Sequence, residues 1–260
     1  MTIQSIFLFA PAESAQPHCG APAYAIGLAK AYGASLTAFC VALDVTTPGR
    51  QADAPGTAIA IAAAALAAGV ECRTLTEHSH AIGMQEVLAE HARVHDLVVI
   101  GVNRDGLLSE RHVAEYLMFE SGRPLVLVPP ACASGDKPVK VAVAWDNTAA
   151  AARALGDAAA LFAAPDAVFV TIDGEKLIQG DLNSEALVAA AARRGILARH
   201  VLADLGNRSV AEALQQEALA HGASLLVMGA FGHSRMRRFM LGSATSDLMQ
   251  NIRMPVLVSH

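Results

Sequence analysis

Residues 223–243 read ASLLVMGAFGHSRMRRFMLGS and combine a strand, a glycine loop and the start of a helix. The apolar run 225–228 is typical of a buried strand. Gly229 and Gly232 follow it, and after nine further residues come Gly242 and Ser243, where a helix over 243–252 is predicted. Glycines let a backbone approach phosphate closely, and the free N–H groups of a helix N-terminus favour an anion. The stretch therefore predicts a phosphate-binding loop, the alternative being a tight turn that serves only packing.

Strands and helices alternate through the whole second half of the chain. Continuously apolar strands of this kind indicate a parallel sheet covered on both faces. With strand order 3-2-1-4-5, a ligand site is expected beyond strands one and four, after Trp145 and Met228. The predicted strands are 139–145, 167–172, 196–202, 225–228 and 255–259, and the predicted helices are 149–163, 184–194, 209–220 and 243–252.

The loop after the first of these strands contains Asp146, Asn147 and Thr148. A carboxylate at a strand terminus can accept hydrogen bonds from ribose hydroxyls, as acidic residues do in dinucleotide-binding folds. Any of the three residues could instead act as the N-cap of the following helix. Because Asp146 lies beside the predicted glycine loop, we favour ligand contact.

The first half repeats the pattern of the second. Residues 25–41, AIGLAKAYGASLTAFCV, align without a gap to residues 154–170, ALGDAAALFAAPDAVFV, at an offset of 129. HDLVVIG at 95–101 then matches ASLLVMG at 223–229, and RPLVLV at 123–128 matches MPVLVS at 254–259. The segment 129–138, PPACASGDKP, has the composition of a linker. The sequence therefore predicts two tandem α/β domains, at 1–130 and 137–260.

The second half resembles the universal stress protein family. Its G-x-x-G, nine residues, G-[ST] pattern is similar to that family's ATP-binding signature, Ala144-Trp145-Asp146 resembles its first strand end, and 254–259 resembles its closing strand. Asn147 stands where the family commonly has glycine. The resemblance implies two doubly wound, adenine nucleotide α-hydrolase-like sheets of five parallel strands, with ATP, ADP or AMP as ligand, with or without Mg²⁺. The ligand-binding residues that it implies are Asp146, Val170, Thr171, Met228, Gly229, Gly232, His233, Gly242, Ser243 and Ala244.

The equivalent loop of the first half lacks these features. If Gly101 is matched to Gly229, Arg104 stands in place of Gly232, and the first strand ends in Phe-Ala-Pro at 9–11 with no aspartate. Counting back from the closing strand places Arg111-His112 opposite Gly242-Ser243. We therefore interpret the first domain as degenerate, with a structural or pairing role.

Composition excludes several other classes of protein. The net charge of −5 argues against broad nucleic-acid or membrane-surface binding, and no apolar run is long enough to cross a bilayer. The first residues lack the positive charge of a secretory signal, so a cytoplasmic location with free thiols is expected. His78, His80, His91 and His95 lack a clear metal-site pattern, and we interpret them as surface histidines rather than metal ligands.

The resemblance to universal stress proteins implies that the protein is a nucleotide-regulated stress-response or signalling module. It would pair through exposed fifth strands, Pro124–Val128 and Pro255–Ser259, either within one chain or as a homodimer. No P-loop or kinase motif is present, so any ATP hydrolysis should be slow and no catalytic residue is assigned. Two alternatives remain open. One is a weak ATPase or adenylate-forming enzyme at the same pocket, and the other is a nucleotide-free protein that acts through protein contacts.

Overall fold

The computed structural model describes residues 2–12, 16–43, 53–79, 83–102, 110–174, 184–230 and 243–260. For residues 43, 78, 79, 243, 244 and 246 it describes the backbone alone. The chain divides into two compact units, Met1–Lys137 and Pro138–His260. Each unit is an α/β sandwich with its own core.

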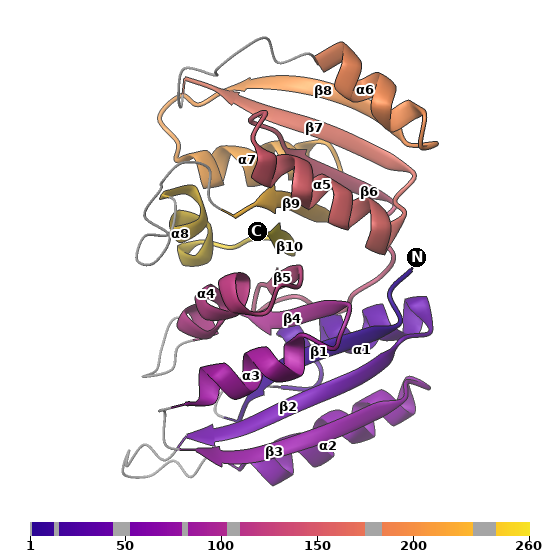
Figure 1. Ribbon diagram of the computed structural model, residues 1–260, viewed down its shortest axis with the longest axis vertical. Helices are drawn as coiled ribbons and strands as arrows, with labels where there is room; N and C mark the ends of the chain where they lie inside the picture. Colours follow the sequence, from indigo (N-terminus) through magenta and orange to yellow (C-terminus); the bar gives the residue numbers. More distant parts are fainter. Residues whose placement is uncertain are drawn as a thin grey trace. The chain divides into compact units, whose positions relative to one another are not determined.

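The first unit has five parallel strands in the order β3-β2-β1-β4-β5. Helices α1 and α2 pack together on one face of the sheet, and α3 and α4 pack together on the other (Figure 1). The strands are β1 (Ser5–Pro11), β2 (Ser35–Leu43), β3 (Cys72–Ser79), β4 (Leu97–Gly101) and β5 (Leu125–Val128). The helices are α1 (Gly20–Tyr32), α2 (Ala54–Ala67), α3 (Met84–Ala92) and α4 (Glu110–Glu120).

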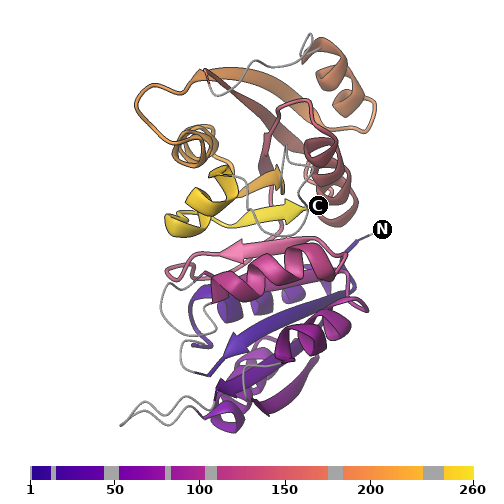
Figure 2. The ribbon, with the colours of Figure 1, turned by 60° about the vertical axis from the view of Figure 1, so that its left-hand side comes forward.

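The second unit repeats this topology, in the order β8-β7-β6-β9-β10, again with parallel strands. Figure 2 shows α5 and α6 on one side of this sheet and α7 and α8 on the other. The strands are β6 (Lys140–Ala144), β7 (Asp166–Asp173), β8 (Leu197–Asp204), β9 (Leu225–Gly229) and β10 (Val256–Ser259). The helices are α5 (Ala149–Phe162), α6 (Ser184–Ala192), α7 (Val210–Ala220) and α8 (Ser243–Gln250).

The predicted fold class is confirmed, because both units have the expected order 3-2-1-4-5 with parallel strands. One detail differs from the prediction of fully buried strands. The outermost strand β8 is largely exposed or half-buried, with Leu197 at 75% and Leu202 at 57% exposure. An edge strand has a neighbour on one side only, and the nine-residue helix α6 covers little of it.

Helix ends in the second unit follow local sequence rules. Ser209 caps α7 through a complete capping box with Glu212, which satisfies two backbone N–H groups at once. A glycine with positive φ follows the C-terminal end of two of these helices. Gly195 follows α6 with a φ of 75°, and Gly222 follows α7 with a φ of 71°. Glycine tolerates this left-handed conformation without steric penalty, so each helix stops where the chain must turn into the next strand.

The connecting segment, residues 129–137, packs along α1 of the first unit. The carbonyl of Cys132 accepts a 2.7 Å hydrogen bond from Gly20 N at the start of α1. A Cβ built on Gly27 would overlap the backbone of Gly135, and the Lys137 ammonium lies 4.9 Å from the ring centre of Tyr32. The composition of this segment is that of a linker, but its course is fixed by close contact with a helix.

The prediction of surface histidines is wrong for His91 and His95. Both are half-buried, and both pack against the ring of Phe7, at centroid distances of 6.4 Å and 5.4 Å. His95 is also bonded through Nε2 to Thr37 Oγ1 and through Nδ1 to the His91 carbonyl. Both histidines, one on α3 and one just after it, therefore pack against the sheet of the first unit. The side chain of His78 and residue 80 lie outside the described structure.

Candidate functional site

The loop after β6 brings a carboxylate to the edge of the second sheet. Asp146 is exposed, and its Oδ1 accepts hydrogen bonds from Thr148 N at 3.1 Å and Thr148 Oγ1 at 2.6 Å. Thr148 is in turn the N-cap of α5, accepting from Ala151 N at 3.2 Å. The cap is therefore Thr148 and not Asp146. Within the described residues Oδ2 of Asp146 has no donor, so it is available to a ligand.

Asn147 takes over the conformation that a glycine would supply at this position. Its φ is +60°, in the left-handed region, which asparagine tolerates better than most residues. The departure from the family's usual glycine thus leaves the tight turn intact, and Asp146 remains directed by its two bonds to Thr148.

A chain of hydrogen bonds fixes the edge next to β7. The hydroxyl of Thr171, only 2% exposed, donates to the Trp145 carbonyl at 2.7 Å. Because that proton is used, His200 Nε2 donates to Thr171 Oγ1 at 2.9 Å, which leaves Nδ1 as the acceptor of the neutral ring. Burial lowers the pKa of the His200 imidazole. Val170, fully buried, accepts from Trp145 N at 2.9 Å.

On the other side of β6, strand β9 ends in Met228, which is 5% exposed, and Gly229. A Cβ built on Gly229 would overlap the backbone and side chain of Ala150, in the first turn of α5. Glycine is thus required because α5 approaches the strand end closely. The register pairs Val143 of β6 with Val227 of β9, so the ends of the two strands lie level at the carboxyl edge.

One edge of the second sheet, where β6, β7 and β9 end, therefore contains five of the predicted ligand residues. These are Asp146, Val170, Thr171, Met228 and Gly229. Ser243 and Ala244 form the first turn of α8. A helix that joins two parallel strands runs antiparallel to them, so this turn also lies at the carboxyl edge. Gly232, His233 and Gly242 lie outside the described residues.

Sequence reasoning missed two polar groups at the same edge. Within the described residues, two buried side-chain atoms have no hydrogen-bond partner, and they are Nε1 of Trp145 and Oγ of Ser259. Ser259 ends β10 and is paired in register with Gly229. Counting two residues on from the Val143–Val227 pair places Trp145 level with Gly229 as well. The register of the closing strand could have identified Ser259, and the position next to Asp146 could have identified Trp145.

The corresponding edge of the first unit has a different composition. β1 ends in the buried Pro11, and α4 begins at Glu110, which is 8% exposed. A Cβ built on Gly101, at the end of β4, would stand 2.9 Å from each carboxylate oxygen of Glu110. A negative side chain thus lies at the strand end and helix start where a phosphate would bind. Arg104 lies outside the described residues.

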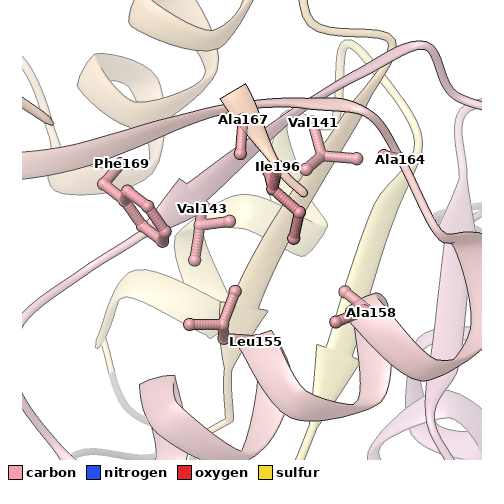
Figure 3. A pocket seen from close by; sticks show the side chains of 9 residues that line it. Val141, Val143, Leu155, Ala158, Ala164, Ala167, Phe169 and Ile196 are labelled. Atoms are coloured by element: carbon pink, nitrogen blue, oxygen red, sulfur yellow. The ribbon is translucent and has the colours of Figure 1, made fainter. Parts of the chain in front are cut away.

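A separate recess lies below this edge in the second unit (Figure 3). It is formed between α5 and the strands β6 and β7, and its lining offers no polar side chain to orient a nucleotide. We therefore do not assign it to the ligand site. Its lining consists of Val141, Val143, Leu155, Ala158, Ala159, Ala164, Ala167, Phe169 and Ile196.

The described residues contain no metal site, and burial keeps three of the four thiols protonated. These residues include no group of three or more His, Cys, Asp and Glu side chains that could hold a metal ion. The four cysteines are free thiols, and burial raises the pKa of Cys40 to about 12 and also that of Cys72 and Cys132. A raised pKa keeps a thiol protonated and unreactive. Among the described helices, none has the length and apolar character needed to cross a membrane.

Comparison with known proteins supports the assignment of the second unit. Residues 139–260 match the model of the Universal stress protein family. The second unit is therefore a universal stress protein domain. A search of curated protein sequences gave no match.

Solved structures extend the likeness in fold to the whole chain. A universal stress protein from Archaeoglobus fulgidus DSM 4304 superposes with a TM-score of 0.67 at 14% identity, covering 97% of this chain and 95% of the other. A functionally unknown protein from Pseudomonas aeruginosa PAO1 superposes with a TM-score of 0.59 at 14% identity, covering 99% and 92%. At this identity the likeness concerns the fold, and it includes both units.

Proposed function

We propose that the second unit binds an adenine nucleotide, ATP, ADP or AMP, and that the protein acts as a nucleotide-regulated module in stress response or signalling. The observation that carries the proposal is Asp146. Its carboxylate lies exposed at the switch point of a parallel sheet, with Oδ1 held by Thr148 and Oδ2 open. A carboxylate in that position suits the two hydroxyls of a ribose.

Three further features support a nucleotide rather than another small ligand. Gly229 begins the glycine-rich sequence after β9, and α8 starts at the same edge with its N-terminus. Such an N-terminus favours phosphate. The family match covers the same residues, 139–260.

The first test asks whether the protein carries or binds a nucleotide. Purified protein is denatured and the released small molecules are identified, and the melting temperature of nucleotide-free protein is measured with and without ATP. We expect an adenine nucleotide in the released fraction, and a thermal shift on adding ATP. Absence of both would refute the proposal and favour a protein that acts through protein contacts alone.

The second test asks whether Asp146 is the contact. Asp146→Asn keeps an acceptor for Thr148 but removes the charge, so the loop should stay folded while ATP affinity falls about tenfold, as expected for a hydrogen bond to a charged group. Asp157→Ala is the matched control, because it removes a carboxylate from a surface ion pair with Arg153 on α5. Equal affinity of all three proteins would remove Asp146 from the site.

Chemistry at this site should be slow. Hydrolysis needs a positioned base and a clamp for the transferred phosphoryl group. Among the described groups of this site, the Asp146 carboxylate is the proposed ribose contact and His200 is bonded to Thr171. We therefore expect binding without rapid turnover. A steady ATPase rate that is lost in Asp146→Asn would instead support the enzyme.

A further inference from the structure

Trp145 and Ser259 lie on one row across the carboxyl edge of the second sheet. The row runs from Thr171 on β7 through Trp145 and Gly229 to Ser259 on β10, as the registers show. Within the described residues, both unpaired buried polar atoms belong to this row, and the described part of the first unit contains none. Native proteins pair nearly all buried polar groups, so these two atoms call for a partner other than the described residues.

The position of the Trp145 backbone is fixed by its neighbours. Its N–H donates to Val170 at 2.9 Å and its carbonyl accepts from Thr171 at 2.7 Å, so the residue is tied to β7 on both sides. The indole meets Phe169 edge to face, at a centroid distance of 6.2 Å and an angle of 72°. An aromatic face is at best a weak acceptor for the indole N–H. The ring as a whole remains partly exposed, beside the exposed Asp146.

These positions give the order of the groups along the carboxyl edge, from β7 at one side to α8 at the other. Trp145 contacts β7, through Phe169 and Thr171. Asp146 follows directly at the end of β6, and Gly229 on β9 leads toward α8 on the far side. A neutral N–H donor on a flat aromatic ring suits a planar heterocycle with acceptor nitrogens. The helix N-terminus suits phosphate, and the carboxylate between them suits the sugar.

We propose that Trp145 recognises the base of the bound nucleotide, its indole N–H donating to an acceptor nitrogen of the purine ring. This inference rests on the proposed function, since it names the group that selects the base at the same site. It makes Trp145 a specificity-determining residue, while Asp146 and the α8 N-terminus bind parts that all nucleoside phosphates share.

The single tryptophan of the chain allows a test with almost no change of shape. Expression with β-(benzothien-3-yl)alanine in place of tryptophan alters residue 145 alone, exchanging the indole N–H for sulfur. Affinities for ATP and for inorganic tripolyphosphate, which has no base, are then measured on both proteins. Loss of one neutral hydrogen bond predicts about tenfold weaker ATP binding. Tripolyphosphate affinity should stay the same.

The outcomes separate this inference from the proposed function. If the unmodified protein binds ATP and the analogue protein binds it equally well, the role of Trp145 is refuted while the nucleotide site stands. Equal weakening of ATP and tripolyphosphate would also refute it, because the change would then act on the whole site. If the unmodified protein does not bind ATP, the proposed function fails and this inference fails with it.

Fluorescence gives an independent readout of the same contact. Because Trp145 is the only tryptophan, its emission reports this edge of the second unit directly. Saturating ATP should change the emission intensity or wavelength, whereas saturating tripolyphosphate should leave both nearly unchanged. Emission that is indifferent to ATP, in protein shown by calorimetry to bind it, would place the base elsewhere and overturn the inference.

Discussion

The carboxylate of Glu110 packs against Gly101 at the end of β4, so that a Cβ built on this glycine would stand 2.9 Å from both of its oxygens. Glu110 is also the first residue of α4, where a negative charge is favourable. In the second unit the equivalent strand, β9, ends in Gly229, and the equivalent helix, α8, begins at Ser243. The first unit thus has a carboxylate at the strand end and helix start where the second unit has glycine and serine.

This contact predicts a stoichiometry of one nucleotide per chain. A phosphate entering the first unit would meet a buried carboxylate, and like charges at close range repel strongly. Calorimetric titration with ATP should therefore reach saturation at one equivalent. Asp146→Ala, in the second unit, should weaken this single binding event by about tenfold or more. A second equivalent that survives this substitution would show that the first unit binds nucleotide after all.

The repeat offers a matched pair of glycines for a stability test. Gly27 of α1 and Gly156 of α5 occupy equivalent positions at the offset of 129. A Cβ on Gly27 would overlap Gly135 and Ser134 of the connecting segment, whereas a Cβ on Gly156 would meet nothing within 4 Å.

Alanine should therefore have opposite effects at these two positions. Gly27→Ala should destabilise the first unit by about 1–3 kcal/mol through overpacking. Gly156→Ala should stabilise the second by up to about 1 kcal/mol, because alanine is the better helix former. Urea denaturation of both variants measures these changes. Equal effects of the two substitutions would contradict the close packing of the connecting segment on α1.

Much of the fold could be predicted because each signal is local. The alternation of apolar strands with helices predicted a parallel sheet covered on both faces. Capping residues and glycines predicted helix limits within about two residues of those observed, as at Ser209 and Gly195. The exposure of β8 was not foreseen, since covering of a strand depends on the length and position of α6. Nor was the packing of His91 and His95 on Phe7, which depends on tertiary contact.

The candidate site was predictable only in part. Asp146 and Gly229 stand out in the sequence because a strand end followed by Asp or Gly is a local pattern. The sequence marks Trp145 only by its position next to Asp146. The unpaired polar atoms of Trp145 and Ser259 become evident only in the structure, where the registers place both residues level with Gly229. Glu110 could not be singled out at all, because its importance rests on contact with Gly101, nine residues earlier.

Gln215 offers a test of how the second unit holds its closing strand. Its side chain is fully buried on α7, donates to the Asn251 carbonyl at 3.0 Å and accepts from Arg253 N at 2.7 Å. Both partners lie between α8 and β10. Gln215→Leu would leave two backbone groups without their partner, and we expect a loss of about 2–3 kcal/mol in the free energy of unfolding. Gln216→Leu, next to it on α7, is the control, and an equal loss there would contradict the argument.

Protonation of His200 should make the free energy of unfolding fall at acidic pH. Burial lowers the pKa of this imidazole in the folded protein, so the folded state holds the proton less tightly than the unfolded chain does. The neutral ring therefore contributes stability above the unfolded pKa of about 6.5. That contribution falls as the pH drops below this value, and it is lost once the folded pKa is passed.

Replacing the ring by a side chain that does not titrate should remove this dependence. In His200→Gln the amide N–H can still donate to Thr171, which His200 Nε2 does at 2.9 Å. The difference in unfolding free energy between the native protein and the variant should shift in favour of the variant as the pH falls from 7.5 to 5. Urea denaturation at a series of pH values measures it. A difference that is constant over this range would show that His200 titrates alike in the folded and unfolded states.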